Sequence, residues 1–259
     1  MNIGVSTACL YPLETEKSLQ TLAQAGFKDT EIFFNASYEM YGFIFDQIKE
    51  ILDNYNMNVT SIHPFTSFAE SFLLFNAYRR RFYDGLEFYK KYFDTANRLN
   101  CDIVVIHGCK LQYAIEEDDY IERFAKLYEL GREFGVKIAQ ENVVNFMSGS
   151  LLFLENMKKQ LGNDFKMVFD IKQAVRSGYN PLDLVDKLGD SFVHLHLSDH
   201  DLDKGKDCLP PGLGNFDFKT FFDKLKEKNY QGNSVIELYR HNFDKPQELY
   251  ESKLLLEKI

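Results

Sequence analysis

The segment FVHLHLSDH, residues 192–200, contains three of the chain's six histidines. Its first six residues alternate in the manner of a buried strand, so the side chains of His194 and His196 lie on the same face. The polar residues that follow, including His200, begin a loop. We therefore expect His196 at the carboxyl end of a strand, His194 one layer deeper and His200 in the loop.

Seven further segments have strand character, and segments of helical periodicity separate them. The eight predicted strands are 3–8, 30–34, 59–63, 102–107, 136–141, 166–170, 192–197 and 234–238. Parallel strands need helical crossovers, and eight of them can close into a barrel without edges. We predict an α/β fold, a (β/α)8 TIM barrel, as a single domain over residues 1–259. A doubly wound open sheet is the competing fold, but CLYPLET after the first strand lacks its usual Gly-rich turn.

Composition limits the classes of partner. The formal net charge is −9 and the pI is about 5.2, which counts against nucleic acid as a partner. The N-terminal residues lack the pattern of a signal peptide, and no apolar run approaches the roughly 18 residues that span a bilayer. The four cysteines lack CxxC spacing, so we expect free thiols and a cytoplasmic protein. The partners that this leaves are a small-molecule substrate and further copies of the chain in a homo-oligomer.

Two predicted connections are long. PFTSFAESFLLFNAY, residues 64–78, follows the third strand, and SDHDLDKGKDCLPPGLGNFDF, residues 198–218, follows the seventh. The Gly, Pro and Asp content of the second segment predicts an ordered but irregular loop. Long loops of compact domains are often functional, so both are candidates for lining a site.

Four polar side chains come at the ends of four consecutive predicted strands: Glu141, Asp170, His196 and Glu237. Taken singly, such a residue is more often a solvated or capping group. Together, if their faces point inward, they converge at the carboxyl end of the barrel, where catalytic groups of this fold lie. A divalent cation would relieve the repulsion among three carboxylates. This mainly hard ligand set favours one Mn²⁺, with Mg²⁺, Co²⁺ or Zn²⁺ as alternatives.

Other residues near strand ends have a functional and a packing interpretation. His63 and His107 end the third and fourth strands and are candidate metal ligands or substrate-binding groups. Phe34 and Phe65 follow strand ends and are candidates for one wall of a substrate pocket, or for ordinary packing. For His194 we expect a hydrogen-bonded position behind the metal ligands.

With these residues placed, the chain resembles the xylose isomerase-like barrel superfamily, in particular its ketose 3-epimerases and hydroxypyruvate isomerases. The resemblance covers nearly the whole chain. It rests on the pair Glu141 and Asn142, on Asp170, on HLSD at 196–199, on PPGLGNFDF at 210–218 and on IEL with Glu237. It implies that Glu141, Asp170, His196 and Glu237 bind one divalent metal, and that the two glutamates, Glu141 and Glu237, are catalytic and exchange a substrate proton.

The sequence departs from the superfamily at two places. Gln173 stands where a histidine usually contacts substrate, and it can still hydrogen-bond a hydroxyl. The superfamily also includes apurinic endonucleases with three zinc ions, and His63 and His107 match two of their ligand positions. Gln173 and Cys208 replace further zinc ligands of that pattern, so a full three-metal site is not expected.

The resemblance and the residues together predict a sugar isomerase or epimerase that acts on a small-molecule sugar substrate, a ketose or small hydroxycarbonyl compound, through an enediolate. The alternatives are a metal-dependent lyase or dehydratase, an apurinic endonuclease-like hydrolase, and a non-catalytic sugar-binding relative. A phosphorylated substrate would need cations at the site. The candidates follow strand ends, where such side chains are more often solvated: Lys110, Lys172, Arg176 and Arg240.

Overall fold

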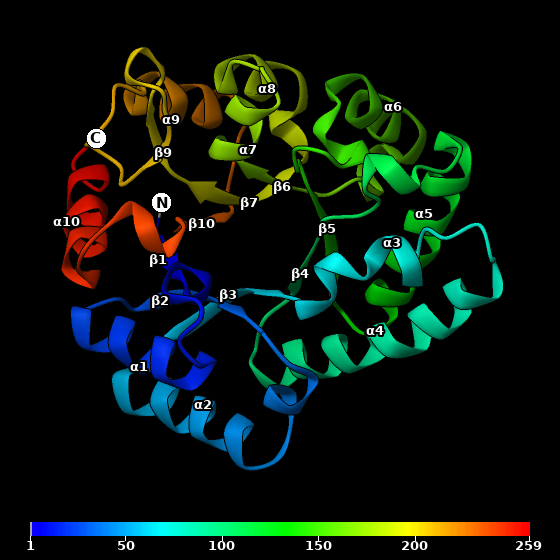
Figure 1. Cartoon of the computed structure of the whole chain (residues 1–259), viewed down its shortest axis with the longest axis horizontal. Coiled ribbons are helices and arrows are strands. Elements are labelled where there is room, and N and C mark those ends of the chain that lie inside the picture. The colour runs from blue at the N-terminus through cyan, green and yellow to red at the C-terminus, as the bar shows by residue number, and fades with distance from the viewer. Residues whose placement is uncertain (1) are drawn as a thin grey trace.

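The computed structural model describes residues 2–259, except for the side chain of Ser67, and shows a closed barrel of eight parallel strands (Figure 1). The order around the barrel is β1-β10-β7-β6-β5-β4-β3-β2. The barrel strands are β1 (Ile3–Ser6), β2 (Asp29–Phe33), β3 (Asn58–His63), β4 (Ile103–Ile106), β5 (Lys137–Glu141), β6 (Met167–Asp170), β7 (Phe192–Leu197) and β10 (Asn233–Ile236). The predicted TIM barrel is confirmed, with strand ends shifted by one or two residues.

Helices surround the barrel (Figure 1). They are α1 (Thr15–Ala25), α2 (Gly42–Tyr55), α3 (Glu70–Leu73), α4 (Arg80–Arg98), α5 (Glu117–Glu133), α6 (Leu151–Leu161), α7 (Ile171–Arg176), α8 (Pro181–Leu188), α9 (Phe218–Glu227) and α10 (Pro246–Leu256). Local chemistry sets several ends: Asn180 Oδ1 accepts a hydrogen bond from Leu182 N at 3.0 Å before Pro181 begins α8. Across residues 2–259, no helix combines the length and apolar character needed to cross a membrane.

The strands separate two layers of apolar side chains. Ile103, Val105, Ala139 and Val168 form a small buried cluster of their own. Neighbouring positions, such as Val104, Ile138 and Phe169, belong to the large core that the helices share. Because strand side chains alternate, the residues two positions after Ala139 and Val168 point the same way as these two. These residues are Glu141 and Asp170, the last residues of β5 and β6.

The connection after β7 contains more regular structure than the sequence predicted. Asp199–Asp201 (β8) and Lys206–Leu209 (β9) pair as an antiparallel two-stranded sheet, so the expectation of an irregular loop is wrong for these residues, although the segment is ordered as expected. The buried carboxylate of Asp199 accepts backbone N–H hydrogen bonds from Gly212, Gly214 and Phe216 at 2.9–3.0 Å. A Cβ at Gly214 would lie 2.3 Å from Asp199 Oδ1, so this close approach requires glycine.

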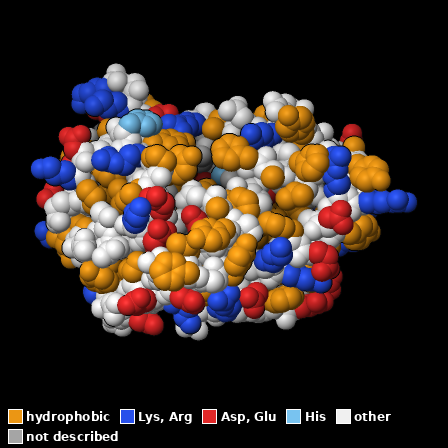
Figure 2. Space-filling view, turned by 60° about the horizontal axis from the view of Figure 1, so that its bottom comes forward, with side chains coloured by type: hydrophobic (Ala, Val, Ile, Leu, Met, Phe, Trp, Pro, Cys, Tyr) orange, Lys and Arg blue, Asp and Glu red, His pale blue; other side chains and the backbone are white. Residues whose placement is uncertain are grey.

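The surface seen in Figure 2 mixes acidic, basic and hydrophobic side chains. Basic side chains on this face lie among acidic ones and do not form a continuous patch. A nucleic-acid-binding face would gather its lysines and arginines instead. The charge distribution on this side of the barrel therefore gives no support to a nucleic-acid partner.

Candidate metal and active site

The four residues predicted as metal ligands converge. Glu141 ends β5, Asp170 ends β6, His196 lies in β7, and Glu237 directly follows β10. Each offers one ligand atom, and these atoms all lie within 4.8 Å of one another. The parallel barrel explains this convergence, because the carboxyl ends of its strands meet at one rim.

The imidazole of His196 is oriented by a carboxylate behind it. Its Nε2 lies 3.1 Å from Glu31 Oε2. Its Nδ1 faces the three other acidic residues, at 3.3 Å from Glu237 Oε2, 3.6 Å from Glu141 Oε1 and 3.7 Å from Asp170 Oδ2. Among the described residues, Nδ1 has no hydrogen-bond partner. Nδ1 is therefore the ring atom available to a cation, while Nε2–H can donate to Glu31.

Glu31 is a site residue that the sequence analysis missed. It is fully buried in the middle of β2, where Ser6 Oγ donates to Oε1 at 3.0 Å and Ser61 Oγ donates to Oε2 at 2.8 Å. Burial raises the pKa of Glu31, but the charge of His196 and the hydrogen bond with it outweigh this and lower the pKa to about 2. A glutamate within the apolar run TEIFF was the available signal.

His194 lies behind the ligand cluster, as predicted. Its ring is fully buried, and Nε2 lies 3.0 Å from Ser61 Oγ and 3.7 Å from Glu31 Oε2. Burial lowers the pKa of His194 to about 4, so the ring is neutral at neutral pH. His194 therefore supports Glu31 and Ser61 from within the barrel. His200 belongs to β8, outside the ligand cluster.

Glu141 and Asp170, at the ends of β5 and β6, are held at a fixed spacing by hydrogen bonds of Asn142. Asn142 Oδ1 accepts a hydrogen bond from the backbone N–H of Asp170 at 2.8 Å, and its Nδ2 donates to the backbone oxygen of Asp170 at 2.9 Å. Asp170 Oδ1 in turn caps α7 by accepting from Gln173 N at 3.0 Å. The Glu141–Asn142 pair thus fixes the spacing of two candidate ligands.

Lys172 is one of the four candidate cations that follow strand ends, for which a solvated position is the commoner alternative. Its side chain is only 4% exposed, and its Nζ contacts both Asp170 Oδ2 and Glu237 Oε2. Burial lowers the pKa of Lys172, but the two carboxylates outweigh this and raise it well above the ordinary value. The contact with Glu237 spans 65 positions, so no local pattern predicts it.

His63, the last residue of β3, and His107, directly after β4, lie next to Glu141. Their Nε2 atoms lie 2.9 Å apart. Glu141 Oε2 lies 3.0 Å from His107 Nε2 and 3.5 Å from His63 Nε2, yet it accepts no hydrogen bond of good geometry from the described residues. Glu141 therefore belongs to two potential cation-binding groups, one with His63 and His107 and one with Asp170, His196 and Glu237.

These groups open into a cavity of about 570 Å³. Its polar lining includes His63, His107, Glu141, Lys172, Gln173 and Glu237. Aromatic side chains line it as well: Tyr11, Phe33, Phe65, Phe68 and Tyr239. A cavity with convergent ionisable groups and apolar surface is suited to a small molecule that has both hydroxyl groups and an apolar carbon skeleton.

Of the two phenylalanines that are candidates for a pocket wall, only Phe65 lines the cavity. Phe34 is fully buried in the core beneath the helices, so for this residue the packing interpretation is correct and the pocket interpretation is wrong; Phe33 lines the cavity instead. Neighbouring residues of an extended segment point to opposite sides, so a shift of one position exchanges cavity and core. Gln173 lines the cavity, and its Oε1 accepts a hydrogen bond from Val144 N at 3.1 Å.

The other candidate cations do not line the cavity. Arg176 binds the carboxylate of Asp207 and donates from Nη1 to Tyr239 Oη at 2.7 Å. Arg240 donates to the backbone oxygen of Phe243, and Lys110 Nζ lies 4.8 Å from the ring centre of Phe68. Of the four cations considered, Lys172 alone is among the residues that line the cavity.

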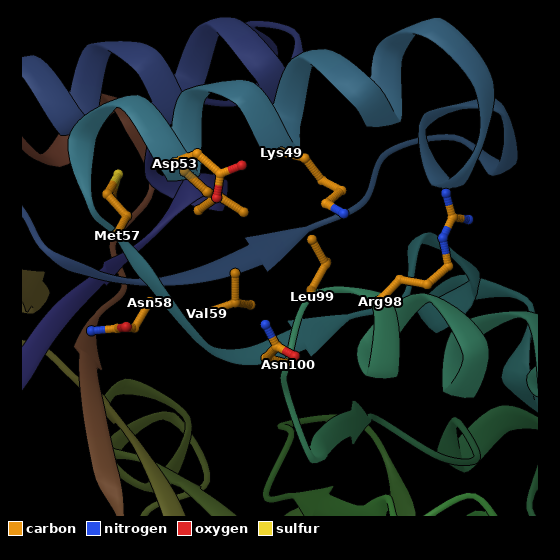
Figure 3. A pocket seen from close by; sticks show the side chains of 9 residues that line it. Lys49, Asp53, Met57, Asn58, Val59, Arg98, Leu99 and Asn100 are labelled. Atoms are coloured by element: carbon orange, nitrogen blue, oxygen red, sulfur yellow. The ribbon is translucent and has the colours of Figure 1, made fainter.

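A second, smaller hollow lies away from these groups (Figure 3). It has a volume of about 130 Å³ and lies between α2, the start of β3 and the end of α4. Its polar side chains are Lys49, Asp53, Asn58, Arg98 and Asn100. Because Asn58 begins β3, this hollow is at the amino end of the strand, opposite the end that carries His63. In barrels of this fold, that face serves stability.

Comparison with known proteins assigns the barrel to a family. Residues 19–259 match the family model described as xylose isomerase-like TIM barrel. The fructoselysine 3-epimerase of Shigella flexneri is 22% identical over 95% of this chain and 93% of its own length. The inosose dehydratase of Clostridium beijerinckii is 24% identical over 86% of this chain and 81% of its own length.

Two solved structures share the fold. A D-tagatose 3-epimerase-like protein has a TM-score of 0.81 and 22% identity, covering 100% of this chain and 96% of that protein. A xylose isomerase-like TIM barrel protein from Mycobacterium smegmatis, in complex with magnesium, has a TM-score of 0.72 and 16% identity, covering 94% of this chain and 87% of that protein.

Proposed function

Because this chain belongs to the xylose isomerase-like TIM barrel family, we propose that it is a divalent-metal-dependent sugar isomerase or epimerase. Its substrate is a ketose or a small hydroxycarbonyl compound, and the reaction passes through an enediolate. The observation that carries the proposal is the convergence of Glu141, Asp170, His196 and Glu237 beside a cavity that both glutamates line. The epimerase among the relatives supports it.

The donor set fits a divalent metal. Glu141, Asp170, His196 and Glu237 would hold it, since Glu141 Oε2 and His196 Nδ1 are buried without hydrogen-bond partners among the described residues. Three carboxylates and one imidazole favour Mn²⁺, with Mg²⁺, Co²⁺ or Zn²⁺ as alternatives. When bound, the ion supplies a Lewis acid that polarises the substrate carbonyl, an effect worth several kcal/mol.

The two glutamates would move the proton. Burial raises the pKa of Glu141, but the charge of His107 outweighs this and lowers the pKa well below its usual value. Burial likewise raises the pKa of Glu237, but Lys172 and His196 outweigh this and lower it. Both carboxylates are therefore ionised at neutral pH, and either can accept the proton next to the carbonyl. Return to the opposite face of the same carbon gives an epimer, and return to the neighbouring carbon gives an isomer.

The remaining cavity residues would bind and orient the sugar. His63, His107 and Gln173 can hydrogen-bond hydroxyl groups, while Phe33 and Phe65 offer apolar surface to the carbon skeleton. A cytoplasmic location is supported by the four cysteines, which are all free and buried.

The test is NMR-detected deuterium incorporation in D₂O, with Mn²⁺-loaded protein and a panel of free ketoses and hydroxypyruvate. We expect exchange at a carbon next to the carbonyl, and its loss in both Glu141→Gln and Glu237→Gln. The exposed Lys159→Met variant serves as the control and should exchange like the wild type. Near-normal exchange in both glutamate variants would refute the assignment.

A dehydratase is the second candidate, and the inosose dehydratase among the relatives favours it. After the same proton abstraction, a hydroxyl group on the β-carbon would leave with a proton as water, and a carbon–carbon double bond would form. The two functions differ in product. A dehydratase would form an unsaturated carbonyl compound with new ultraviolet absorbance, whereas an epimerase or isomerase would conserve the substrate's mass.

A further inference from the structure

The ammonium group of Lys172 lies inside the carboxylate cluster. Lys172 extends from the first turn of α7 and reaches both Asp170, two residues before it, and Glu237, after β10. Its side chain is 4% exposed, so water does not screen these contacts. Removing one partner of such a buried ion pair is costly, because it leaves an uncompensated charge in the interior.

Lys172 uses the same oxygens that a metal would need. The atoms it contacts are Asp170 Oδ2 and Glu237 Oε2. Those two oxygens also lie 3.7 and 3.3 Å from His196 Nδ1, the ring nitrogen that is available to a cation. An ammonium and a divalent ion repel each other, and two cations cannot share these oxygens at contact distance without a large loss of energy.

We propose that Lys172 is a built-in occupant of the cation site, whose ammonium holds Asp170 and Glu237 until a divalent metal displaces it. This inference rests on the proposed metal site and concerns how tightly that site binds metal. The ammonium supplies part of the positive charge that the carboxylates require, so the metal-free protein keeps its cluster assembled. Metal binding is correspondingly weakened, because it must first break two buried ion pairs.

The cavity offers the displaced side chain a new position. Lys172 already lines the cavity, and its Nζ lies 5.8 Å from the ring centre of Tyr239. The ammonium already lies over this aromatic face, which attracts cations, so a displaced Lys172 can stay in contact with it. Arg176 cannot take the same role, because Asp207 and the Tyr239 hydroxyl already hold its guanidinium.

The test is isothermal titration of Mn²⁺ into the metal-free wild type, Lys172→Met and Lys172→Gln. We expect both variants to bind Mn²⁺ at least about tenfold more tightly than the wild type, because no ion pair has to be broken. Lys159→Met removes the same charge from an exposed position of α6 and should leave the affinity unchanged. Equal or weaker binding by both Lys172 variants would overturn the inference.

Thermal unfolding with and without a chelator gives a second readout. The wild type should lose little stability on chelation, whereas Lys172→Met should unfold at a clearly lower temperature until Mn²⁺ is restored, because three buried carboxylates then repel one another. If this variant folds only with Mn²⁺, its affinity is measured by competition with the chelator. Absence of Mn²⁺ binding in every variant would overturn the metal site and this inference together, whereas equal affinities would overturn this inference alone.

Discussion

Nε2 of His196 lies 3.1 Å from Oε2 of Glu31, although the two residues belong to strands on different sides of the barrel. β7 pairs with β6 and β10, while β2 pairs with β1 and β3, so this contact crosses the barrel interior. It decides which ring nitrogen of His196 faces the three carboxylates. The carboxylate–histidine pair therefore orients the candidate ligand before any cation arrives.

Replacing Glu31 by Gln should weaken Mn²⁺ binding by about 10- to 100-fold, because the uncharged amide no longer fixes the orientation and basicity of His196. Isothermal titration calorimetry measures the Mn²⁺ affinity of both proteins. Ser6→Ala removes another hydrogen bond of Glu31 but leaves its contact with His196, so its affinity should stay within about threefold of the wild type. An unchanged affinity in Glu31→Gln would contradict the orienting role.

The sequence predicted the parts of the site that follow strand ends. Glu141, Asp170, His196 and Glu237 were recognisable because parallel strands bring such residues to one rim. Glu31 was not, since its partner His196 is 165 positions away. Contacts across the barrel depend on its closure, which no local pattern encodes.

One error came from register. Phe33 and Phe34 are adjacent, and the end of β2 decides that Phe33 meets the cavity while Phe34 meets the core. A one-residue difference in the strand boundary exchanges the two, and sequence periodicity does not fix boundaries to one residue.

The two phenylalanines should consequently differ on mutation. Phe34→Ala should lower the free energy of unfolding by about 3–5 kcal/mol, since it leaves a cavity in the core. Phe33→Ala, at a partly exposed position, should cost less stability but raise KM for the substrate identified by deuterium exchange. Urea denaturation and steady-state kinetics measure the two effects. Equal stability losses with no change in KM would show that the assignment of the two faces is wrong.

Gly108, directly after His107, should not tolerate a side chain. Its φ is +90°, and a Cβ there would lie 1.9 Å from Tyr120 Oη. Gly108→Ala should therefore lower the free energy of unfolding by about 2–4 kcal/mol, from backbone strain and overpacking together.

Gly135 is the matched control, because its φ is +72° and no heavy atom lies within 4 Å of a Cβ. Gly135→Ala should lose about 1 kcal/mol. Urea denaturation would reveal a steric effect as a difference between the two variants, and equal losses would exclude it.

Glu70 anchors the segment that carries Phe65 and Phe68 to the barrel. Its carboxyl group accepts hydrogen bonds from Gly108 N at 2.5 Å and Tyr89 Oη at 2.8 Å. Burial is the largest influence and raises the pKa of Glu70 from 4.5 to about 7. The stability that this group contributes is therefore present below pH 4.5 and is lost as the pH rises to about 7.

His194 has the opposite dependence. Burial lowers its pKa from 6.5 to about 4, so its contribution is present above pH 6.5 and is lost as the pH falls toward 4. Each shift corresponds to about 3 kcal/mol. Between pH 4.5 and 6.5, a rise in pH therefore lowers the stability contribution of Glu70 and raises that of His194 in the wild type.

Single substitutions should separate the pH dependence of stability due to Glu70 from that due to His194. From pH 4.5 to 7, the stability advantage of the wild type over Glu70→Gln should shrink by up to about 3 kcal/mol, because unfolding then releases the proton of Glu70 only in the wild type. From pH 4 to 6.5, its advantage over His194→Gln should grow by a similar amount, because unfolding then binds a proton only in the wild type. Urea denaturation across this range measures both differences, which cancel the contributions of all other groups. Differences that stay constant with pH would mean that neither group titrates as its burial requires.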